Sequence, residues 1–110
     1  IFRKLIPKEI PKHERYTEDQ LYGAIWRWTW SGGHIHNLWC FCPRCDAQLV
    51  YRNRISYEAE GNREMTDFIC ERCNDRIASV PGGDKDYAIG AAEREIWRRI
   101  RKHEYASSSG

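Results

Sequence analysis

The fold of this chain is decided by two short stretches, Cys42-Pro43-Arg44-Cys45 and Cys70-Glu71-Arg72-Cys73. Each stretch holds two thiols with two residues between them, and 24 residues separate the stretches. A C-x-x-C turn presents two thiolates to one point, and two such turns supply the four ligands of a tetrahedral metal ion. The spacing therefore predicts one structural Zn²⁺ site with four ligands: Cys42, Cys45, Cys70 and Cys73.

This site would change the charge balance of the chain. The formal net charge is +2 with neutral histidines. Four thiolates add four negative charges and the zinc ion adds two positive ones, so the closed site brings the sum to zero. A neutral domain gains little from the long-range attraction that drives non-specific nucleic-acid binding. The charge balance lowers the expectation of a nucleic-acid partner without excluding it.

Length and cysteine usage indicate one domain in a reducing compartment. At 110 residues the chain has room for one modest core. A secreted disulfide framework favours an even number of spread cysteines, whereas four of the five here lie in two tight turns. We therefore expect a cytoplasmic metal-binding domain, with Cys40 left over as a small buried residue. No apolar run approaches the roughly 18 residues of a membrane span, and no signal peptide is visible.

The two ends of the chain are predicted to lie outside the core domain. Pro7 and Pro11 disfavour a continuous helix in residues 1–20, for which we expect an arm or the end of a preceding segment. Thr17 with Gln20 three residues later is typical of a helix N-terminus. The single domain is expected over residues 21–106, followed by a disordered serine-rich tail over residues 107–110.

Strand patterns dominate the middle of the chain. Alternation in residues 21–30 places three tryptophans on one face of a predicted strand and Arg27 on the other. A turn signal at residues 31–33 predicts that residues 34–39 form its hairpin partner. Residues 53–66 are polar and are predicted to form a hairpin tip. Further short strands are predicted for residues 48–51, 66–69 and 76–80.

A helix is predicted to close the domain. Asp84 is a suitable N-cap, and the helical pattern continues to about Tyr105. Apolar residues recur at helical spacing and basic residues gather late, which suits the helix dipole. The apolar stripe comprises Ile89, Ala92, Ile96, Trp97 and Ile100. The expected fold class is α+β, with a small antiparallel sheet, an inserted zinc ribbon and a C-terminal helix.

With these turns and flanking strands, the chain resembles the zinc-ribbon superfamily over roughly residues 38–80. The resemblance implies that the four cysteines ligate zinc in a module that is structural or binds a partner. Rubredoxins carry similar turns around iron, but a glycine usually follows each second cysteine. Asp46 and Asn74 occupy those places here, so zinc is expected rather than an iron-based electron carrier.

The sequence predicts no catalytic centre. Four thiolates fill the tetrahedron and leave no position for an activated water. No Ser/His/Asp arrangement, phosphate loop or recognisable pair of acids is present. His34 and His36 lie upstream of the first turn and are expected on a half-exposed strand rather than as ligands. We therefore expect a non-enzymatic module.

Three groups of residues are candidates for partner contacts. The tryptophan row either roofs the core or exposes an aromatic platform for a base, a sugar or a partner side chain. The arginines either form a phosphate-contacting strip or are scattered surface charges. The basic helix end at residues 98–103 is either a solvated face or a contact surface. A protein partner is expected, with nucleic acid as the alternative. The residues of the first two groups are Trp26, Trp28 and Trp30, and Arg27, Arg52 and Arg54.

Overall fold

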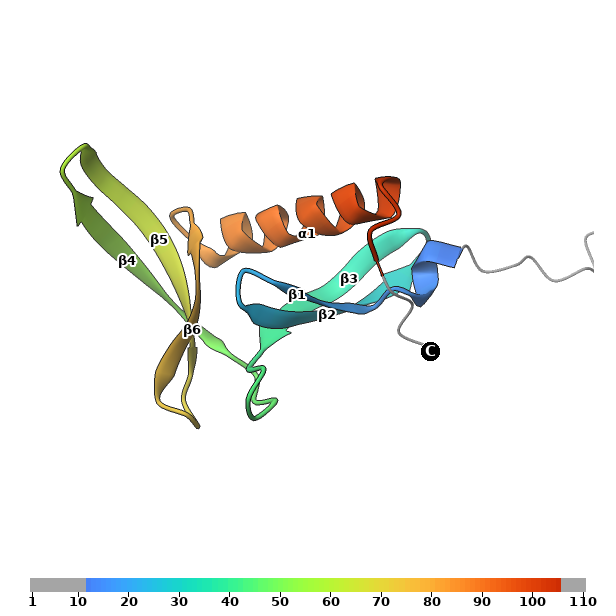
Figure 1. Ribbon diagram of the computed structural model, residues 1–110, viewed down its shortest axis with the longest axis horizontal. Helices are drawn as coiled ribbons and strands as arrows, with labels where there is room; N and C mark the ends of the chain where they lie inside the picture. The colour runs from blue at the N-terminus through green and yellow to red at the C-terminus, as the bar shows by residue number, and fades with distance from the viewer. Residues whose placement is uncertain (1–11, 106–110) are drawn as a thin grey trace, which may run out of the picture.

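The computed structural model describes residues 12–105, which form two three-stranded antiparallel sheets and one long helix (Figure 1). The strand orders are β1-β2-β3 and β4-β5-β6, an arrangement of the predicted α+β class. The first sheet comprises β1 (Glu18–Leu21), β2 (Ala24–Ser31) and β3 (His34–Phe41). The second comprises β4 (Val50–Glu58), β5 (Gly61–Cys70) and β6 (Asp75–Pro81). The helices are η2 (Lys12–Arg15) and α1 (Lys85–Arg101).

The central hairpin of the first sheet agrees with the sequence prediction. In β2, Ala24, Trp26 and Trp28 point into the core, as the period-two pattern indicated. The chain then reverses at Gly32 and Gly33, whose φ angles of 59° and 79° lie in the left-handed region that glycine adopts without strain. β3 returns antiparallel to β2 and continues to Phe41, directly before the first cysteine turn.

The predicted helix start at Thr17 is wrong, because Glu18–Leu21 forms strand β1. β1 pairs antiparallel with β2, and Leu21 is buried at its end. Asp19 accepts hydrogen bonds from Tyr16 and from Arg99 of α1, which fixes the strand against the helix. These long-range contacts outweigh the local capping pattern. Most of the expected N-terminal arm, residues 1–11, and the tail at residues 107–110 lie outside the described residues.

The second sheet contains longer strands than the sequence predicted. Only Ala59 and Glu60 lie between β4 and β5, so the expected polar tip over residues 53–66 is mostly strand. The two strands pair without a register shift from Val50 opposite Ile69 to Glu58 opposite Gly61. β6 pairs only with the part of β5 from Met65 onward. The far half of the β4–β5 hairpin therefore extends as a two-stranded arm, at the upper left of Figure 1.

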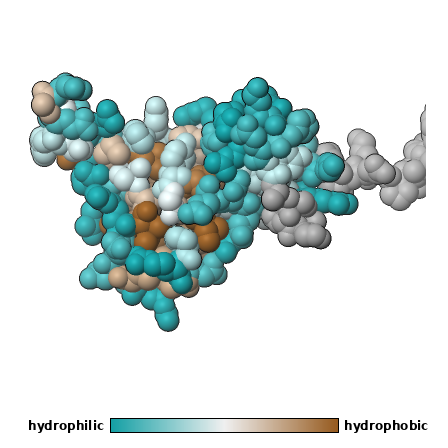
Figure 2. Space-filling model, in the orientation of Figure 1, coloured by the Kyte–Doolittle hydropathy of each residue, from teal (hydrophilic) through white to brown (hydrophobic). Residues whose placement is uncertain are grey.

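Helix α1 lies along the first sheet and covers its core (Figure 1). The Asp84 carboxylate accepts the backbone N–H of Tyr87 at 2.8 Å, which confirms the predicted N-cap. The helix ends at Arg101 rather than near Tyr105, and His103 then takes a positive φ of 56°. Its inner face is buried, while the surface over its far end is hydrophilic (Figure 2). The buried helical residues are Ala88, Ala92 and Ile96.

Candidate metal centre

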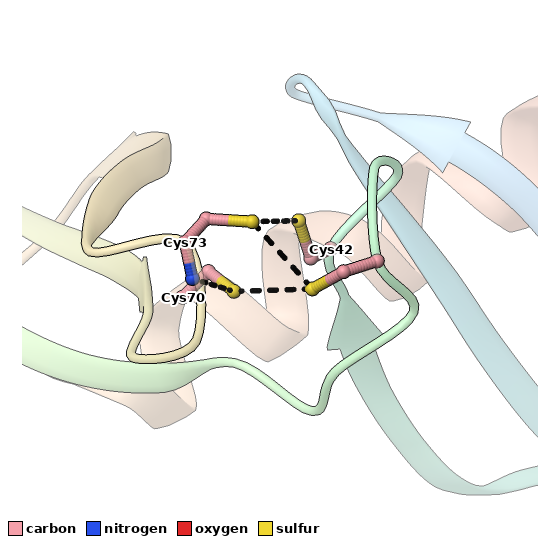
Figure 3. A group of neighbouring side chains, drawn as sticks. Cys42, Cys70 and Cys73 are labelled. Carbon is pink, nitrogen blue, oxygen red and sulfur yellow. Dashed lines mark hydrogen bonds between the residues drawn. The ribbon is translucent and has the colours of Figure 1, made fainter.

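Four cysteine sulfur atoms meet where the two sheets approach each other. Cys42 and Cys45 belong to the loop after β3, Cys70 ends β5, and Cys73 lies in the turn before β6. The four Sγ atoms all lie within 4.8 Å of one another. Figure 3 shows the side chains of Cys42 on one segment and of Cys70 and Cys73 on another pointing toward a common space. The chain thus brings together all four residues that the spacing predicted as ligands.

The distances between the sulfur atoms fit one tetrahedral ion. The Sγ–Sγ distances are 3.9 Å for Cys42–Cys73, 3.5 Å for Cys45–Cys70 and 3.6 Å for Cys45–Cys73. With Zn–S bonds of about 2.3 Å, the sulfurs of a regular tetrahedron lie about 3.8 Å apart. A disulfide would need about 2 Å, and all five cysteines are free thiols. The geometry therefore supports metal binding rather than two disulfides.

Backbone N–H groups face the sulfurs and favour their ionised form. The N–H of Cys73 donates to Sγ of Cys70 at 3.2 Å. Burial raises the pKa of the Cys42 thiol, but N–H groups of Arg44 and Cys45 outweigh it and lower that pKa to about 6. Hydrogen bonds with the thiols of Cys45 and Cys70 raise the pKa of Cys73 to about 12. Ionisation of all four neighbouring thiols would bring four negative charges together, so it requires a bound cation that neutralises them.

Each second cysteine is followed by a residue in the left-handed conformation. The φ angles of Asp46 and Asn74 are 65° and 56°. Apart from glycine, asparagine and aspartate adopt this region most readily. These residues therefore allow the tight turn that glycine allows in rubredoxins. The absence of glycine at these two positions is therefore no argument against an iron site.

Ion pairs on both sides of the cluster hold the cysteine turns in place. Arg44 of the first turn contacts Asp75, next to the second turn, at 2.8 Å. Arg27 of β2 contacts Asp46 at 2.6 Å and Glu18 at 2.7 Å. Exposed pairs of this kind contribute only about 0–1 kcal/mol each. Their effect is to orient the turns relative to each other and to the first sheet.

The tryptophan row is mainly part of the core, as the packing interpretation expected. Trp26 and Trp28 are 0% and 3% exposed. Trp30 is partly buried, and its ring meets that of Trp97 edge to face with centroids 5.3 Å apart. The indole N–H of Trp30 donates to the carbonyl oxygen of Tyr16 at 2.8 Å. The first two rings are therefore not accessible to a partner in this conformation.

The three candidate arginines lie in different surroundings. Arg27 is on the first sheet and is occupied by two carboxylates. Arg54, on the second sheet, donates to both carboxylate oxygens of Asp67, at 2.7 and 3.2 Å. Arg52 is exposed and makes no ion pair within residues 12–105. Two of the three guanidinium groups are thus already neutralised by neighbouring acids.

Sequence reasoning missed Asp67, a carboxylate whose side chain is only 6% exposed. Burial by itself would raise its pKa, but hydrogen bonds from Arg54 and Ser79 lower it below the usual value. The hydroxyl group of Ser79 donates a hydrogen bond to Oδ1 of Asp67, with an O–O distance of 2.7 Å. The sequence pattern does not reveal this buried carboxylate, because Asp67 lies in a polar strand. The residues that pair with it depend on how β4 and β6 align with β5.

Two arginines of the basic helix end are also paired. Arg98 contacts Glu95 and Glu104, and Arg99 contacts Glu95 and Asp19. The hydrogen bond from Arg98 is the main cause that lowers the pKa of Glu95 to about 2. Arg98 and Arg99 therefore act within the fold, since they link residues along α1 and bind α1 to β1, whereas Arg101 and Lys102 are exposed.

The remaining metal-capable residues stand apart from the cluster. Cys40 is fully buried in β3, and burial raises the pKa of its thiol to about 12. His34 and His36 are exposed on β3. In the part of the chain that the structure describes, the group placed to hold a metal ion consists of the four cysteines alone.

Comparison of the chain with protein-family models, curated proteins and solved structures finds no match. Among residues 12–105, no helix is long and apolar enough to cross a membrane.

Proposed function

We propose that this chain is a non-enzymatic binding module in which one structural Zn²⁺ holds two small sheets together for docking to a protein partner. Zinc would be bound by Cys42, Cys45, Cys70 and Cys73. The observation that carries the proposal is the approach of four Sγ atoms within 4.8 Å, from two loops that are distant in sequence.

A structural role is supported by the ligand set and by its place in the fold. Four thiolates complete the coordination of zinc and leave no open position for substrate or water. Among the described residues no β-ladder joins the two sheets, and the ligands come from both sides of this junction. Zinc binding would therefore contribute directly to folding, and comparable sites contribute about 10–16 kcal/mol of apparent binding free energy.

Zinc is proposed over iron because four-cysteine sites of this kind most often hold zinc as a structural ion. Zinc has no redox chemistry, so its bound form is one stable cross-link. The resemblance to zinc ribbons over roughly residues 38–80 points the same way.

A protein partner is proposed over nucleic acid because four of the candidate phosphate-binding arginines are already paired with carboxylates. Arg27, Arg54, Arg98 and Arg99 each contact one or two carboxylates. Using them for phosphate would require those ion pairs to break. The closed zinc site also removes the net positive charge that would attract a polyanion.

Titration of the zinc-loaded chain with labelled duplex and single-stranded oligonucleotides tests this choice. No binding is expected at low salt, where phosphate contacts are strongest. Affinity that falls steeply as salt rises would contradict the protein-docking proposal and favour the nucleic-acid alternative. Arg52→Ala is the matched variant, since this guanidinium is exposed and unpaired among the described residues. It should remove part of any such affinity.

A further inference from the structure

Strand β4 is an unprotected edge of the second sheet. The strand order β4-β5-β6 places it at the outside, where it pairs with β5 among the described strands. Edge strands are usually short, bulged, or marked by proline or charged side chains, especially lysine, which prevents another strand from adding to them. β4 is nine residues long, pairs with β5 in unbroken register and contains no proline or lysine, and its charged residues are of both signs: Arg52, Arg54 and Glu58. Its outer backbone groups are therefore available to a further strand.

The side chains of this edge are also exposed and partly apolar. Ile55 is 49% exposed and Tyr57 is 77% exposed. A hollow of about 460 Å³ lies beside them and extends to Met65 and Gly83. The far half of this arm projects away from the first sheet (Figure 1).

The sequence of β4 is complementary to itself when two copies run antiparallel. A pairing centred on Ile55 keeps every side chain on its own face of the joined sheet. It places Ile55 opposite the partner's Ile55, and Arg52 opposite the partner's Glu58. Because the arrangement is two-fold symmetric, the Arg52–Glu58 pair forms twice. Directly opposed charges of opposite sign stabilise antiparallel strands, and like charges destabilise them.

Neighbouring registers are less complementary. A centre at Arg54 would oppose two Arg54 side chains. A centre at Ser56 would oppose Glu58 to Arg54, which is already held by Asp67, and Arg52 to Glu60, which lies in the turn beyond the end of β4. With the centre at Ile55, both charged groups are available. Arg52 has no ion pair among the described residues, and the carboxylate of Glu58 makes only a long 3.8 Å contact with Arg63.

We propose that the partner docked on β4 is a second copy of this chain, joined as a two-fold dimer with one continuous six-stranded sheet. The inference rests on the proposed function, because it names the protein that the zinc-stabilised module docks. The dimer would combine backbone hydrogen bonds along β4, the contact between two Ile55 side chains and two Arg52–Glu58 ion pairs.

Sedimentation equilibrium of the zinc-loaded chain over a range of concentrations gives the first test. The expected mass rises with concentration from 13.1 kDa to twice that value. A mass that stays at 13.1 kDa at every concentration, in a folded chain that retains its zinc, overturns the dimer. It leaves the proposed function standing with a different protein as partner. Loss of both zinc and fold would instead contradict the proposed function.

Charge reversal then tests the register. Arg52→Glu alone and Glu58→Arg alone each replace two attractive pairs by two repulsive ones, so the dissociation constant should rise roughly tenfold or more. An equimolar mixture of the two variants should dimerise again, because both positions 52 and 58 of one chain are then acidic and both positions of the other are basic. The double variant R52E/E58R should dimerise with itself, because its two pairs are again of opposite charge.

Arg101→Glu is the matched control for Arg52→Glu. It makes the same change of charge at an exposed position of α1, away from β4, and should leave the dissociation constant of the dimer unchanged. Circular dichroism and zinc content of every variant separate weakened pairing from a damaged fold. Single variants that dimerise like the parent, or a mixture that stays monomeric, would overturn the proposed pairing.

Discussion

At the scale of single residues, surroundings give the cysteines different roles. Cys40 and Cys42 are two positions apart in sequence and both are buried. Cys40 points into the apolar core, where burial raises the pKa of its thiol to about 12. Cys42 faces other sulfurs, and its Sγ lies 3.9 Å from that of Cys73. The C-x-x-C spacing was sufficient to predict this difference, because it specifies which thiols share a turn.

Cys42→Ser and Cys70→Ser should each lose zinc and unfold, because a three-thiolate site cannot hold the two loops together. Cys40→Ala should keep its zinc and lose only about 1 kcal/mol of unfolding free energy through a small cavity. Circular dichroism during thermal unfolding, with zinc content measured on the same samples, checks both results. A Cys42→Ser chain that melts like the parent would show that the ligand assignment is wrong.

Asp67→Asn should lower the unfolding free energy by about 1–3 kcal/mol at pH 7, because it removes the negative charge and one of the two buried oxygens that accept hydrogen bonds from Arg54. Asp67 has a lowered pKa, so its stabilising effect is complete above the ordinary carboxyl value of 3.8 and is lost only as pH falls below it. Urea unfolding of the zinc-loaded proteins gives the measurement. Glu60→Gln in the exposed hairpin turn is the control and should change little.

At the scale of elements, the sequence predicted the features that depend on interactions between residues close together in the chain. The alternation of β2, the turn at Gly32 and Gly33, and the Asp84 cap all depend on neighbouring residues, and each was predicted. β1 was missed because its pairing with β2 outweighs a capping motif. The length of β4 and β5 was missed because their far halves are exposed on both faces and lack a buried stripe. Asp67 was missed because its partners depend on strand register.

Asp84→Ala tests the contribution of the helix cap. It removes the acceptor for the Tyr87 N–H and should cost about 1 kcal/mol of stability. Asp86→Ala removes the same charge within the first turn of α1, where the side chain is 79% exposed, and should cost less. Thermal unfolding of both variants compares them. Equal losses would indicate that charge alone, rather than the capping bond, stabilises this end of α1.

At the scale of the whole molecule, the two sheets are joined by loops, by α1, by the cysteine cluster and by the buried ring of Phe68, which packs against Trp26 and Trp39 of the first sheet, rather than by strand pairing. Zinc removal should therefore loosen the packing of the second sheet on the first. Addition of a strong chelator should abolish the cooperative thermal transition and the near-ultraviolet signal of the buried tryptophans. Zinc added afterwards should restore both. A chain whose melting temperature is unchanged by the chelator would not depend on a metal for its fold.

Metal analysis of the purified chain tests most directly whether Cys42, Cys45, Cys70 and Cys73 form a structural zinc site. The predicted result is one zinc ion per chain and a colourless protein. Replacement of the zinc by cobalt should give the visible absorption of a tetrahedral thiolate site, and Cys42→Ser should lose it. A red chain that contains iron, or a cooperatively folded chain that contains no metal, would contradict the structural zinc site.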